Sequence, residues 1–506
     1  DEPLLQVVWY ETELGTYGSP YRISIAGNPI RCKFYATVFL LQDGRIRHHI
    51  KGINMNDLTI IGGGLAGCEA AWQAASRGIY VTLFEMRPFV PTSAHRTSQL
   101  AELVCSNSMG SNLLDRPSGL LLEELRRLGS LLVDCAERSA LPAGGALAVD
   151  REGFAARVTE AIMNHPNIKV IREEYGHIPN QPAIIASGPL TSPELAASIQ
   201  QLTGEEHLFF FDAIAPVVFA DSIDMRIVFR GSRYKVGSEE AGDYINCPMN
   251  SDQYYAFVEQ LLAADRIQLR DFEKRIPEGV PAGGQGFFEG CLPIEILAER
   301  GRDTLAFGPM RPTGLQNARG PAPKVHAVLQ LRQDDLAGSL YNLVGCQTNL
   351  TFSEQRRVFR SVPGLEKAEF ARYGQMHRNT FIASPRLLLP TLQSREYPDL
   401  FFAGQITGVE GYLGNIATGL LAGVNAAEVL LYGRNPIVLP QTTMLGALCH
   451  YITHANLAGF QPMKANYGIL PPIQNPKVSR RERALQFTER ALLALNPLLM
   501  QFQTQA

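Results

Sequence analysis

The stretch Leu58-Thr-Ile-Ile-Gly-Gly-Gly-Leu-Ala-Gly67 decides the fold, because a short apolar run leads directly into three glycines at GxGxxG spacing. The apolar run predicts a buried strand. Cys68 to Arg77 then favours a helix, with Gly78 placed to cap its end. Tyr80 to Phe84 predicts a second buried strand, which Glu85 follows. This order of strand, glycine turn, helix, strand and acid is typical of a Rossmann-like nucleotide-binding unit.

The segment Gly62-Gly63-Gly64-Leu65-Ala66-Gly67 predicts a site for a dinucleotide pyrophosphate. The first glycine permits the tight turn, the second lets the backbone approach the phosphates, and the third lets helix and strand lie close together. The helix N-terminus supplies amides and positive dipole. Glu85 stands where a ribose hydroxyl is bound, which favours FAD or NAD over NADP. The alternative, a glycine-rich turn in an ordinary α/β domain, leaves Glu85 unexplained.

Length and composition indicate a globular protein of more than one domain. The chain has 506 residues, of which 45% are hydrophobic and 19% charged, and a single core of that size is uncommon. The formal net charge is only −3. A polyanionic partner would therefore have to bind a local basic patch, because the field of the whole molecule does not attract it.

The cysteines point to a reducing compartment rather than to disulfides or structural zinc. There are eight, without a CxxC pair or a metal-like Cys/His cluster, at positions 32, 68, 105, 135, 247, 291, 346 and 449. The sequence shows no secretory signal, and we expect no apolar run long enough to cross a membrane. These features predict a cytoplasmic protein with free thiols, most of them core residues.

The order of patterns predicts four segments. Residues 1–54 precede Met55, which resembles a natural start, and we interpret them as an added leader of unknown role. They contain β-like runs such as Phe34 to Leu41. Residues 55–208 form the first part of an FAD-binding domain, 209–335 an inserted α+β substrate domain, and 336–506 the second part with a C-terminal helical tail. The predicted fold class is α/β, with a doubly wound parallel sheet.

Within the first part, several further elements are predicted from periodicity and caps. The leucines between Gly119 and Glu137 predict one amphipathic helix. Ile168 to Arg172 and Ala183 to Ser187 predict strands, and Ser192-Pro193 is typical of a helix start.

A late glycine-rich segment predicts the return to the nucleotide domain. Asp399 to Gly404 predicts a buried strand, and Gly414 to Leu431 a helix rich in small residues. Gly404, Gly408 and Gly411 lie in the loop between them, so the loop and helix N-terminus predict a second anion site beside a flavin. The small residues of the helix, among them Ala417, Gly419, Ala422 and Gly423, would then let a flat ligand lie close. The alternative is a helix that packs tightly on the sheet.

Nine segments occur in the order found in one known family. They are Ile61-Gly-Gly-Gly-Leu-Ala-Gly67, Ala101-Glu-Leu-Val-Cys-Ser-Asn-Ser108, Tyr244-Ile-Asn-Cys-Pro-Met249, Phe287-Phe-Glu-Gly-Cys-Leu-Pro-Ile-Glu295, Arg300-Gly-Arg-Asp-Thr304, Gly308-Pro-Met310, Met376-His-Arg-Asn-Thr-Phe381, Gly404-Gln-Ile-Thr-Gly-Val-Glu-Gly-Tyr412 and Phe460-Gln-Pro-Met463. From Met55 to about Pro472 the chain therefore resembles the folate- and FAD-dependent tRNA (uracil-5-)-methyltransferase family.

The resemblance implies a reaction, its cofactors and its partners. Members of the family transfer a methylene group from 5,10-methylenetetrahydrofolate to the T-loop uridine of tRNA and reduce it to a methyl group. They use FAD and a nicotinamide nucleotide, NADPH or NADH, and produce 5-methyluridine. Because uracil carbon-5 becomes nucleophilic only after a thiolate adds at carbon-6, the reaction needs a reactive cysteine. No second complete GxGxxG is present, so we expect the nicotinamide to bind transiently over the flavin from the inserted domain.

Carried onto this sequence, the resemblance implies two catalytic thiols. We interpret Cys247 as the nucleophile and Cys105 as the assisting thiol, and the two could exchange roles. Pro248 favours an extended or turn conformation at Cys247, which suits an exposed thiol. Weaker candidates, each with an ordinary structural or solvated alternative, are His377 and Arg378, Glu289 and Glu295, Arg300, Arg302 and Arg311, and the basic stretch of Lys477, Arg480, Arg481, Arg483 and Arg490.

Two departures from the family pattern affect these expectations. Gly414-Asn415-Ile416 replaces the usual Glu-Ser-Ala, which changes a contact near the flavin. Met109-Gly110 stands where many relatives carry a basic residue, so the field that ionises Cys105 would be weaker. Three rival interpretations stay open: a related flavoprotein that modifies the tRNA wobble uridine, a plain FAD-dependent oxidoreductase, and a non-catalytic flavin-binding module.

Overall fold

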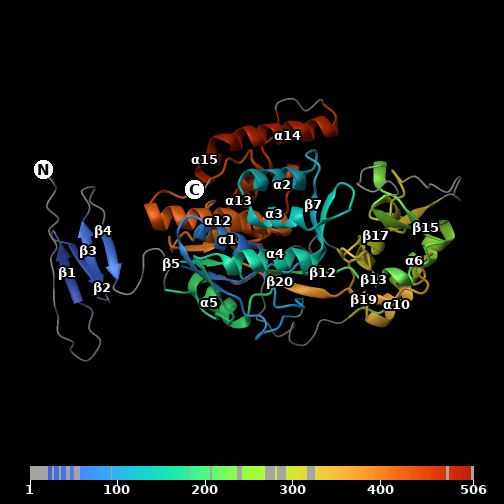
Figure 1. Cartoon of the computed structure of the whole chain (residues 1–506), viewed down its shortest axis with the longest axis horizontal. Helices are drawn as coiled ribbons and strands as arrows, with labels where there is room; N and C mark the ends of the chain where they lie inside the picture. Colours follow the sequence, from blue (N-terminus) through green and yellow to red (C-terminus); the bar gives the residue numbers. More distant parts are fainter. Residues whose placement is uncertain are drawn as a thin grey trace. The chain divides into compact units, whose positions relative to one another are not determined.

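The structure is a computed structural model of the whole chain (Figure 1). It describes strand backbones at 21–25, 28–32, 36–40 and 46–50, and then residues 57–92, 94–180, 182–204, 208–235, 242–267, 280–281, 292–315, 325–473 and 478–502. The chain divides into two compact units, Asp1–Asp57 and Leu58–Ala506.

The first unit contains two antiparallel pairs of strands. One pair is β1 (Tyr21–Ile25) with β2 (Asn28–Cys32), and the other is β3 (Ala36–Leu40) with β4 (Ile46–Ile50). β3 falls within the β-like run predicted from the sequence. The interpretation of residues 1–54 as an added leader stays a prediction.

The second unit is built on a five-stranded sheet in the order β10-β6-β5-β11-β21. The strands are β5 (Asp57–Ile61), β6 (Tyr80–Phe84), β10 (Ile168–Ile171), β11 (Ala183–Ile185) and β21 (Leu400–Phe402). Their registers are parallel, with β10 on β6 and β11 between β5 and β21. The predicted Rossmann-like sheet is confirmed, including the late strand that returns to it.

Helices cover both faces of this sheet, because alternate strand residues point to opposite sides. Leu58 and Ile60 belong to one apolar core, which also contains α1 (Leu65–Ala75) and α12 (Tyr412–Tyr432). Ile61 and its neighbours Ile185 and Phe402 belong to a second core, under α5 (Pro193–Thr203). Figure 1 shows α1 and α12 on one side of the sheet and α5 on the other.

The small residues of α12 serve contact with α1. A Cβ atom added at Gly419 would lie 2.3 Å from the carbonyl oxygen of Ala66, and one at Gly423 would lie 2.5 Å from that of Ala70. The two helix backbones therefore touch at these glycines. The alternative weighed for this helix, tight packing inside the domain, is the correct one for Gly419 and Gly423. Tyr412 and Asn415, at the N-terminal end of α12, line a pocket.

The predicted helix from Gly119 to Glu137 is wrong as one element, because the structure has α2 (Pro117–Arg127) and α3 (Leu131–Arg138). Gly129 between them adopts a φ of +76°, a conformation that suits glycine and ends a helix. Ser130 then starts α3, since its side chain accepts a hydrogen bond from the backbone N–H of Val133.

The inserted part has a six-stranded antiparallel sheet in the order β14-β15-β17-β18-β13-β19. Its strands are β13 (Val217–Phe219), β14 (Phe229–Arg230), β15 (Tyr244–Met249), β17 (Ala327–Gln333), β18 (Leu340–Leu343) and β19 (Phe370–Arg372). It carries α6 (Ser251–Leu262), α8 (Ile294–Glu299), α9 (Thr304–Phe307) and α10 (Phe352–Phe359). Its core runs from Val218 to Ala368, so the insertion continues well beyond the predicted boundary at 335.

Two antiparallel strands join the inserted part to the nucleotide domain. β12 (Leu208–Ala213) leads outward and β20 (Met376–Phe381) leads back, with β16 (Val280–Pro281) beside β12. A small sheet of β7 (Ser108–Ser111), β9 (Ala146–Val149) and β8 (Ala140–Leu141) precedes α4 (Arg151–Asn164) on the nucleotide side.

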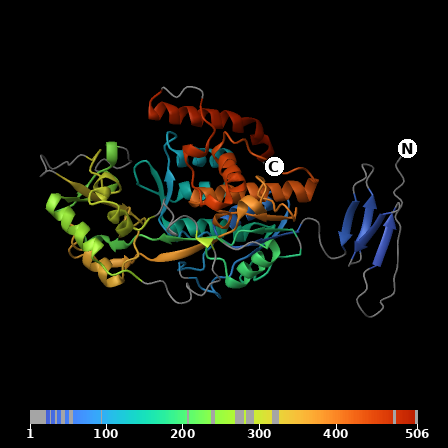
Figure 2. The ribbon, with the colours of Figure 1, turned by 180° about the vertical axis from the view of Figure 1, so that it is seen from behind.

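The C-terminal helices complete the nucleotide domain. They are α11 (Ser384–Leu387), α13 (Met444–His454), α14 (Arg480–Leu495) and α15 (Leu499–Phe502). The buried carboxylate of Glu124 on α2 accepts the backbone N–H groups of Met444 and Leu445, which caps α13 from a neighbouring helix. Burial raises the pKa of Glu124 to about 7. Both ribbon views show α14 outside the layer formed by α12 and α13 (Figures 1 and 2).

One described helix, α12, is long and apolar enough by composition to cross a membrane, which differs from our expectation of no such run. Its most apolar window is 83% buried inside the protein. The contact with α1 accounts for this apolar character, because a helix buried on all sides needs no polar face.

The contact between α1 and α12 makes a stability prediction. Gly419→Val forces side-chain atoms into the backbone of Ala66, so we expect the free energy of unfolding to fall by about 3 kcal/mol. Urea unfolding followed by circular dichroism measures it. Gly459→Val is the matched control, because Gly459 is exposed and open space surrounds its Cβ position. An unchanged midpoint for the Gly419 variant would contradict the described contact.

Candidate functional site: a two-part nucleotide pocket with a thiol at its rim

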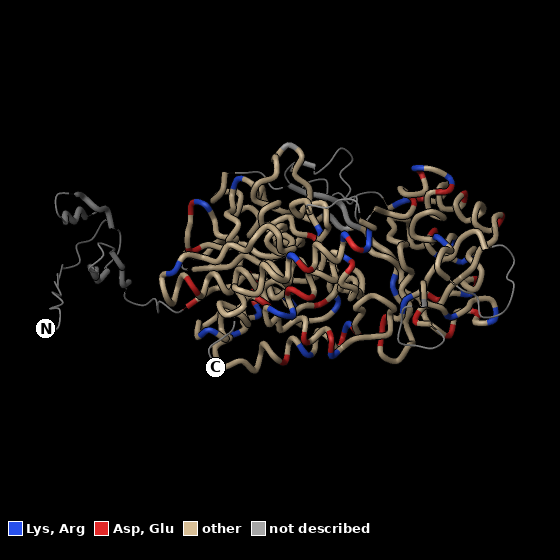
Figure 3. The backbone as a smooth tube through the Cα atoms, turned by 90° about the horizontal axis from the view of Figure 1, so that it is seen from above, with Lys and Arg blue, Asp and Glu red and all other residues tan. Residues whose placement is uncertain are grey.

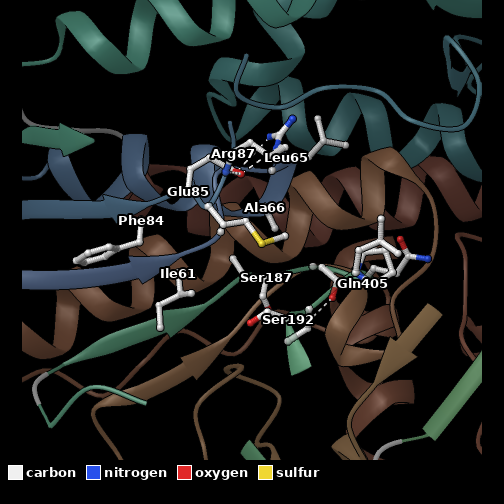
Figure 4. Close-up of a pocket in the computed structure, with 18 of the residues that line it drawn as sticks. Ile61, Leu65, Ala66, Phe84, Glu85, Arg87, Ser187, Ser192 and Gln405 are labelled. Carbon is white, nitrogen blue, oxygen red and sulfur yellow. Dashed lines mark hydrogen bonds and ion pairs between the residues drawn. The ribbon is translucent and has the colours of Figure 1, made fainter. Parts of the chain in front are cut away.

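A pocket opens at the carboxyl edge of the five-stranded sheet, where the loops after all five strands converge (Figure 4). It is an open cleft whose lining comes from residues after each of the five strands. The lining residues include Gly62, Gly64, Leu65, Ala66, Glu85, Ser187, Gly404, Gln405, Tyr412 and Asn415. Ligands of doubly wound sheets bind at this edge.

The first half of the pocket is the turn between β5 and α1. Gly62 has a φ of +107°, and an added Cβ would lie 2.4 Å from the carbonyl oxygen of Ala186, so only glycine fits. Gly67 lies close against Gly62, because a Cβ atom added at Gly67 would lie 1.8 Å from the carbonyl oxygen of Gly62. Gly64 is different, because nothing lies within 4 Å of its Cβ position. The backbone there faces open space beside the first amides of α1, which is what a pyrophosphate requires.

Glu85 forms a buried ion pair with Arg87 at the end of β6 (Figure 4). Its Oε1 accepts the backbone N–H and the Nε–H of Arg87, and its Oε2 accepts the backbone N–H of Gly63 and an Nη–H of Arg87. Although burial alone raises the pKa of Glu85, the bonds and charge of Arg87 outweigh it and hold the pKa below its usual range. All four acceptor positions of the carboxylate are in use, so a ribose hydroxyl must replace or share one of these donors.

The second half of the pocket is the loop before α12. Gly404 has a φ of +81° and its N–H donates to Thr418 Oγ1 at 2.9 Å, which fixes the loop on the helix. Tyr412 and Asn415 of the first turn of α12 line the pocket. The Oδ1 atom of Asn415 is buried and has no hydrogen-bond partner among the residues that the structure describes. Such an orphaned acceptor needs a donor from a ligand or water, so the departure from the family pattern at this position still leaves a polar contact to a cofactor.

Four predicted glycines do not line the pocket themselves. Gly63 bonds to Glu85, and Gly67 supports Gly62. Gly408 lies against Phe460, and Gly411 precedes the first residue of α12. They shape the two loops. The residues on both sides of the pocket fit a dinucleotide such as FAD, with backbone amides on one side and an unpaired amide oxygen on the other.

Cys105 directly follows Val104, which lines this pocket. Cys105 is half-buried, and its backbone N–H donates to the hydroxyl of Tyr412 at 2.8 Å. The guanidinium of Arg151 on α4 donates to the carbonyl oxygens of Leu103 at 2.6 Å and Cys105 at 3.1 Å. The segment that carries Cys105 is therefore held by two helices, by α12 through the pocket residue Tyr412 and by α4 through Arg151.

Three arginines meet behind Cys105, where the nucleotide domain touches the inserted part. Arg151 pairs with Asp334 at 3.0 Å, and Arg372 approaches the same carboxylate at 3.5 Å. Arg332 of β17 donates instead to the amide Oδ1 of Asn107, at 2.8 Å. Burial and then Arg151 lower the pKa of Arg372 to about 10, as expected where cations crowd together. We call Arg151, Arg332, Arg372 and Asp334 the arginine junction. Two of its arginines, Arg151 and Arg332, contact residues 103–107, the segment that carries Cys105.

Cys247 lies elsewhere. It is fully buried in the middle of β15, opposite Leu329 of β17, inside the core of the inserted part. Burial raises its thiol pKa, and the charge of Glu366 acts in the same direction. A thiol in this setting is neither exposed nor easily ionised. The placement is at odds with our prediction that Cys247 is the exposed nucleophile, because Pro248 continues the extended strand rather than ending it at the surface.

The weaker candidates are distributed over several settings. Glu295 is buried and accepts hydrogen bonds from Thr348 Oγ1 and the backbone N–H of Asn349, which is a structural role. Arg302 lies over the ring of Tyr255 on the inserted part. Glu289, Cys291, Lys477 and the side chains of His377 and Arg378 lie outside the described residues.

A family model described as glucose inhibited division protein A, or GidA, matches residues 57–432, which is most of the chain. The chain belongs to the GidA family. Among solved structures, Aquifex aeolicus GidA has a TM-score of 0.63 at 16% identity, and the match covers 89% of this chain and 74% of that one. That likeness supports the shared fold.

Two relatives of this chain are named methylenetetrahydrofolate–tRNA-(uracil-5-)-methyltransferase TrmFO. The protein from Anoxybacillus flavithermus is 52% identical over 444 residues, which is 88% of this chain and 99% of that protein. The one from Heliobacterium modesticaldum is 53% identical over 440 residues, which is 87% of this chain and 97% of that protein. The family resemblance inferred from the sequence motifs is confirmed.

Several site residues were missed by the sequence reasoning. Arg87 follows the acid that ends β6, and the pattern Glu-x-Arg could have suggested an ion pair. Arg151, Arg332 and Arg372 lie on three elements far apart in the sequence, so nothing in their spacing signals that they meet.

The open space at Gly64 makes a cofactor prediction. Gly64→Asp places a carboxylate where the pyrophosphate binds without a clash inside the protein, so we expect folded protein that has lost at least about 90% of its FAD. Absorbance near 450 nm and the unfolding midpoint measure the two effects. Gly459→Asp, at an exposed glycine with the same open space, should keep its FAD. A yellow Gly64→Asp protein would refute the assignment of the first half.

Proposed function

We propose that this chain is an FAD-dependent methylenetetrahydrofolate–tRNA-(uracil-5-)-methyltransferase that makes 5-methyluridine in the T-loop of tRNA. The observation that carries the proposal is the extent of identity, 52% over 444 residues, with a relative of that name. The pocket geometry supports it independently, because a dinucleotide site with a thiol at its rim is the minimum that the chemistry needs.

The cofactor is FAD, held between the two halves of the pocket. The amides at the N-terminus of α1 and the exposed backbone at Gly64 receive the pyrophosphate. The buried Oδ1 of Asn415 would accept a hydrogen bond from the bound cofactor. When bound, reduced FAD supplies the hydride that completes the methyl group.

The nucleophile is Cys105 rather than Cys247, which exchanges the roles first expected for the two thiols. A thiolate at Cys105 adds to carbon-6 of the uracil, and the electron pair of the ring double bond makes carbon-5 nucleophilic. Once carbon-5 has bonded to the one-carbon unit, loss of the carbon-5 proton expels the carrier amine and leaves an exocyclic methylene. Hydride addition to that methylene gives the methyl group and expels the sulfur with its electron pair, which restores the ring double bond. Cys105 is half-buried beside a pocket residue, whereas Cys247 is enclosed in a core.

The chemistry of the substrates indicates which kinds of residue bind them. Arg480, Arg481 and Arg483 on the first turn of α14 are exposed, which suits contact with tRNA phosphates, and Arg481 also pairs with Asp115 at 3.2 Å. Arg490 is less suitable, because it donates to the carbonyl oxygens of Pro471 and Pro472. Acidic and basic residues otherwise alternate over the second unit (Figure 3). NADPH or NADH reduces the flavin, approaching from the inserted part.

The location follows from the thiols and the substrate. The six cysteines that the structure describes are all free, which fits the reducing cytoplasm where tRNA is modified. We therefore assign the enzyme to the cytoplasm.

The proposed reaction is tested by giving the purified protein unmodified tRNA, 5,10-methylenetetrahydrofolate labelled in its methylene carbon, and NADPH or NADH. We expect the label in 5-methyluridine after nuclease digestion and mass spectrometry. A tRNA with its T-loop uridine replaced by cytidine is the control and should stay unlabelled. Label at a wobble uridine, or flavin reduction without label in any tRNA, would support a rival interpretation instead.

The same assay distinguishes the roles of Cys105 and Cys247. Cys105→Ala removes the nucleophile, so we expect 5-methyluridine formation to fall by a factor of about 10³ or more while FAD and its reduction are retained. Cys247→Ala leaves a small cavity in the core of the inserted part and should retain methylation at reduced stability. Methylation by the Cys105 variant, or its loss in a folded Cys247 variant, would return the role to Cys247.

A further inference from the structure

The arginine junction contains one guanidinium that has no carboxylate partner. Arg332 is only 8% exposed. Its hydrogen bond from Nε goes to the neutral amide oxygen of Asn107, whereas Arg151 and Arg372 share the carboxylate of Asp334. Within the part of the chain that the structure describes, no acid lies within ion-pair distance of Arg332. A buried cation is rarely left without a counter-charge. Asp334 acts on Arg332 through its charge but also pairs with Arg151 and Arg372, so a further anion near Arg332 is favoured.

The position of Arg332 indicates which anion that is. Asn107, its hydrogen-bond partner, is itself fixed by donating to the carbonyl oxygens of Val149 and Gln333. Asn107 lies two residues after Cys105, and two residues span at most about 7 Å. The charge of Arg332 is thus anchored on the segment that carries the thiol. Burial lowers the pKa of Arg332, and the charges of Tyr244, Asp334 and, least of all, Cys105 act in the opposite direction.

The other charged and titratable groups around Cys105 leave room for this pairing. Arg151 on α4 contacts the Cys105 backbone, but its charge is matched by Asp334. Arg372 on β19 shares that carboxylate. Tyr412 on α12 and Tyr244 on β15 both have their pKa raised by burial, so neither supplies an anion near neutral pH. Three guanidiniums therefore face one carboxylate, and a thiolate adds a second negative charge.

We propose that Arg332 is a positioning residue whose buried, carboxylate-free guanidinium holds Cys105 in the thiolate form. Arg332 matters for catalysis only if Cys105 is the nucleophile, so this inference rests on the proposed function. Its physical content is separate, because it concerns the ionisation of the thiol in the enzyme without tRNA or folate. A neighbouring opposite charge lowers the pKa of a thiol, by about one to three pH units where the two groups are close. Arg332 therefore makes Cys105 reactive near neutral pH.

The test is the pH dependence of Cys105 alkylation in the FAD-bound enzyme. Iodoacetamide is a neutral reagent, so its rate follows the thiolate fraction, and mass spectrometry of the Cys105 peptide separates this thiol from the others. Arg332→Gln removes the charge but keeps a donor for Asn107, and Arg332→Lys keeps the charge. Arg226→Gln is the control, since Arg226 is exposed on the inserted part and pairs with Asp224.

For Arg332→Gln we expect the alkylation midpoint to rise by about one to two pH units and the rate at pH 7 to fall about tenfold or more. Arg332→Lys should stay within about half a unit of the unaltered enzyme, and Arg226→Gln should not shift. FAD content and the unfolding midpoint verify the fold. An unshifted midpoint in folded Arg332→Gln would overturn the inference, as would an equal shift in Arg332→Lys, which indicates a structural role, or an unreactive Cys105 at every pH.

If the alkylation profile shifts as expected while Cys105→Ala still methylates tRNA, the inference about Arg332 stands and the proposed nucleophile fails. If methylation needs Cys105 but its alkylation is independent of Arg332, the proposed function stands and the inference fails. The two claims are thus tested by different measurements on the same variants.

Discussion

The close contact between α1 and α12 is the constraint on which the rest of the structure depends. Gly419 and Gly423 let the backbone of α12 touch that of α1 at Ala66 and Ala70. Because the two helices start from loops at the same edge of the sheet, this contact brings the N-terminal ends of both toward one pocket. A side chain at either glycine would separate the helices and with them the two halves of the nucleotide site. The small residues thus determine where a cofactor binds without touching it.

A second constraint is electrostatic and concerns the junction of the two cores. The nucleotide domain and the inserted part each have their own apolar core, and polar groups fill the space between them. Arg151 and Asp334 join α4 to the end of β17, and Asn107 joins the thiol segment to Arg332. The same contacts that hold the inserted part in place also surround Cys105 with positive charge. Folding and thiol reactivity therefore depend on one network.

The sequence predicted those features that follow from local pattern. The β5–α1–β6 unit, the late strand β21 and the cap at Ser192 all follow from periodicity and residue type over short spans. Prediction failed where the outcome depends on contacts distant in sequence. The leucines of α2 and α3 have one continuous period, and only the conformation of Gly129 divides them. The insertion passes residue 335 because β18 and β19 pair with strands formed earlier in the chain.

The candidate site divides in the same way. Its glycines could be predicted from their spacing, because the conformation and close packing of the turn require glycine at those positions. Cys247 could not be judged, because an extended conformation before proline suits both an exposed loop and the buried strand in which it lies. Arg332 carries no signal in its local sequence, since its role arises from a neighbour on a different domain.

Hydrogen–deuterium exchange of the protein with and without bound FAD tests the central claim most directly, because it reports on both loops at once. The account predicts that FAD slows exchange at residues 62–67 and at residues 404–415 together, with smaller protection at residues 103–107 beside the pocket. Protection confined to the first glycine segment, with no change at residues 404–415, would contradict the two-part pocket.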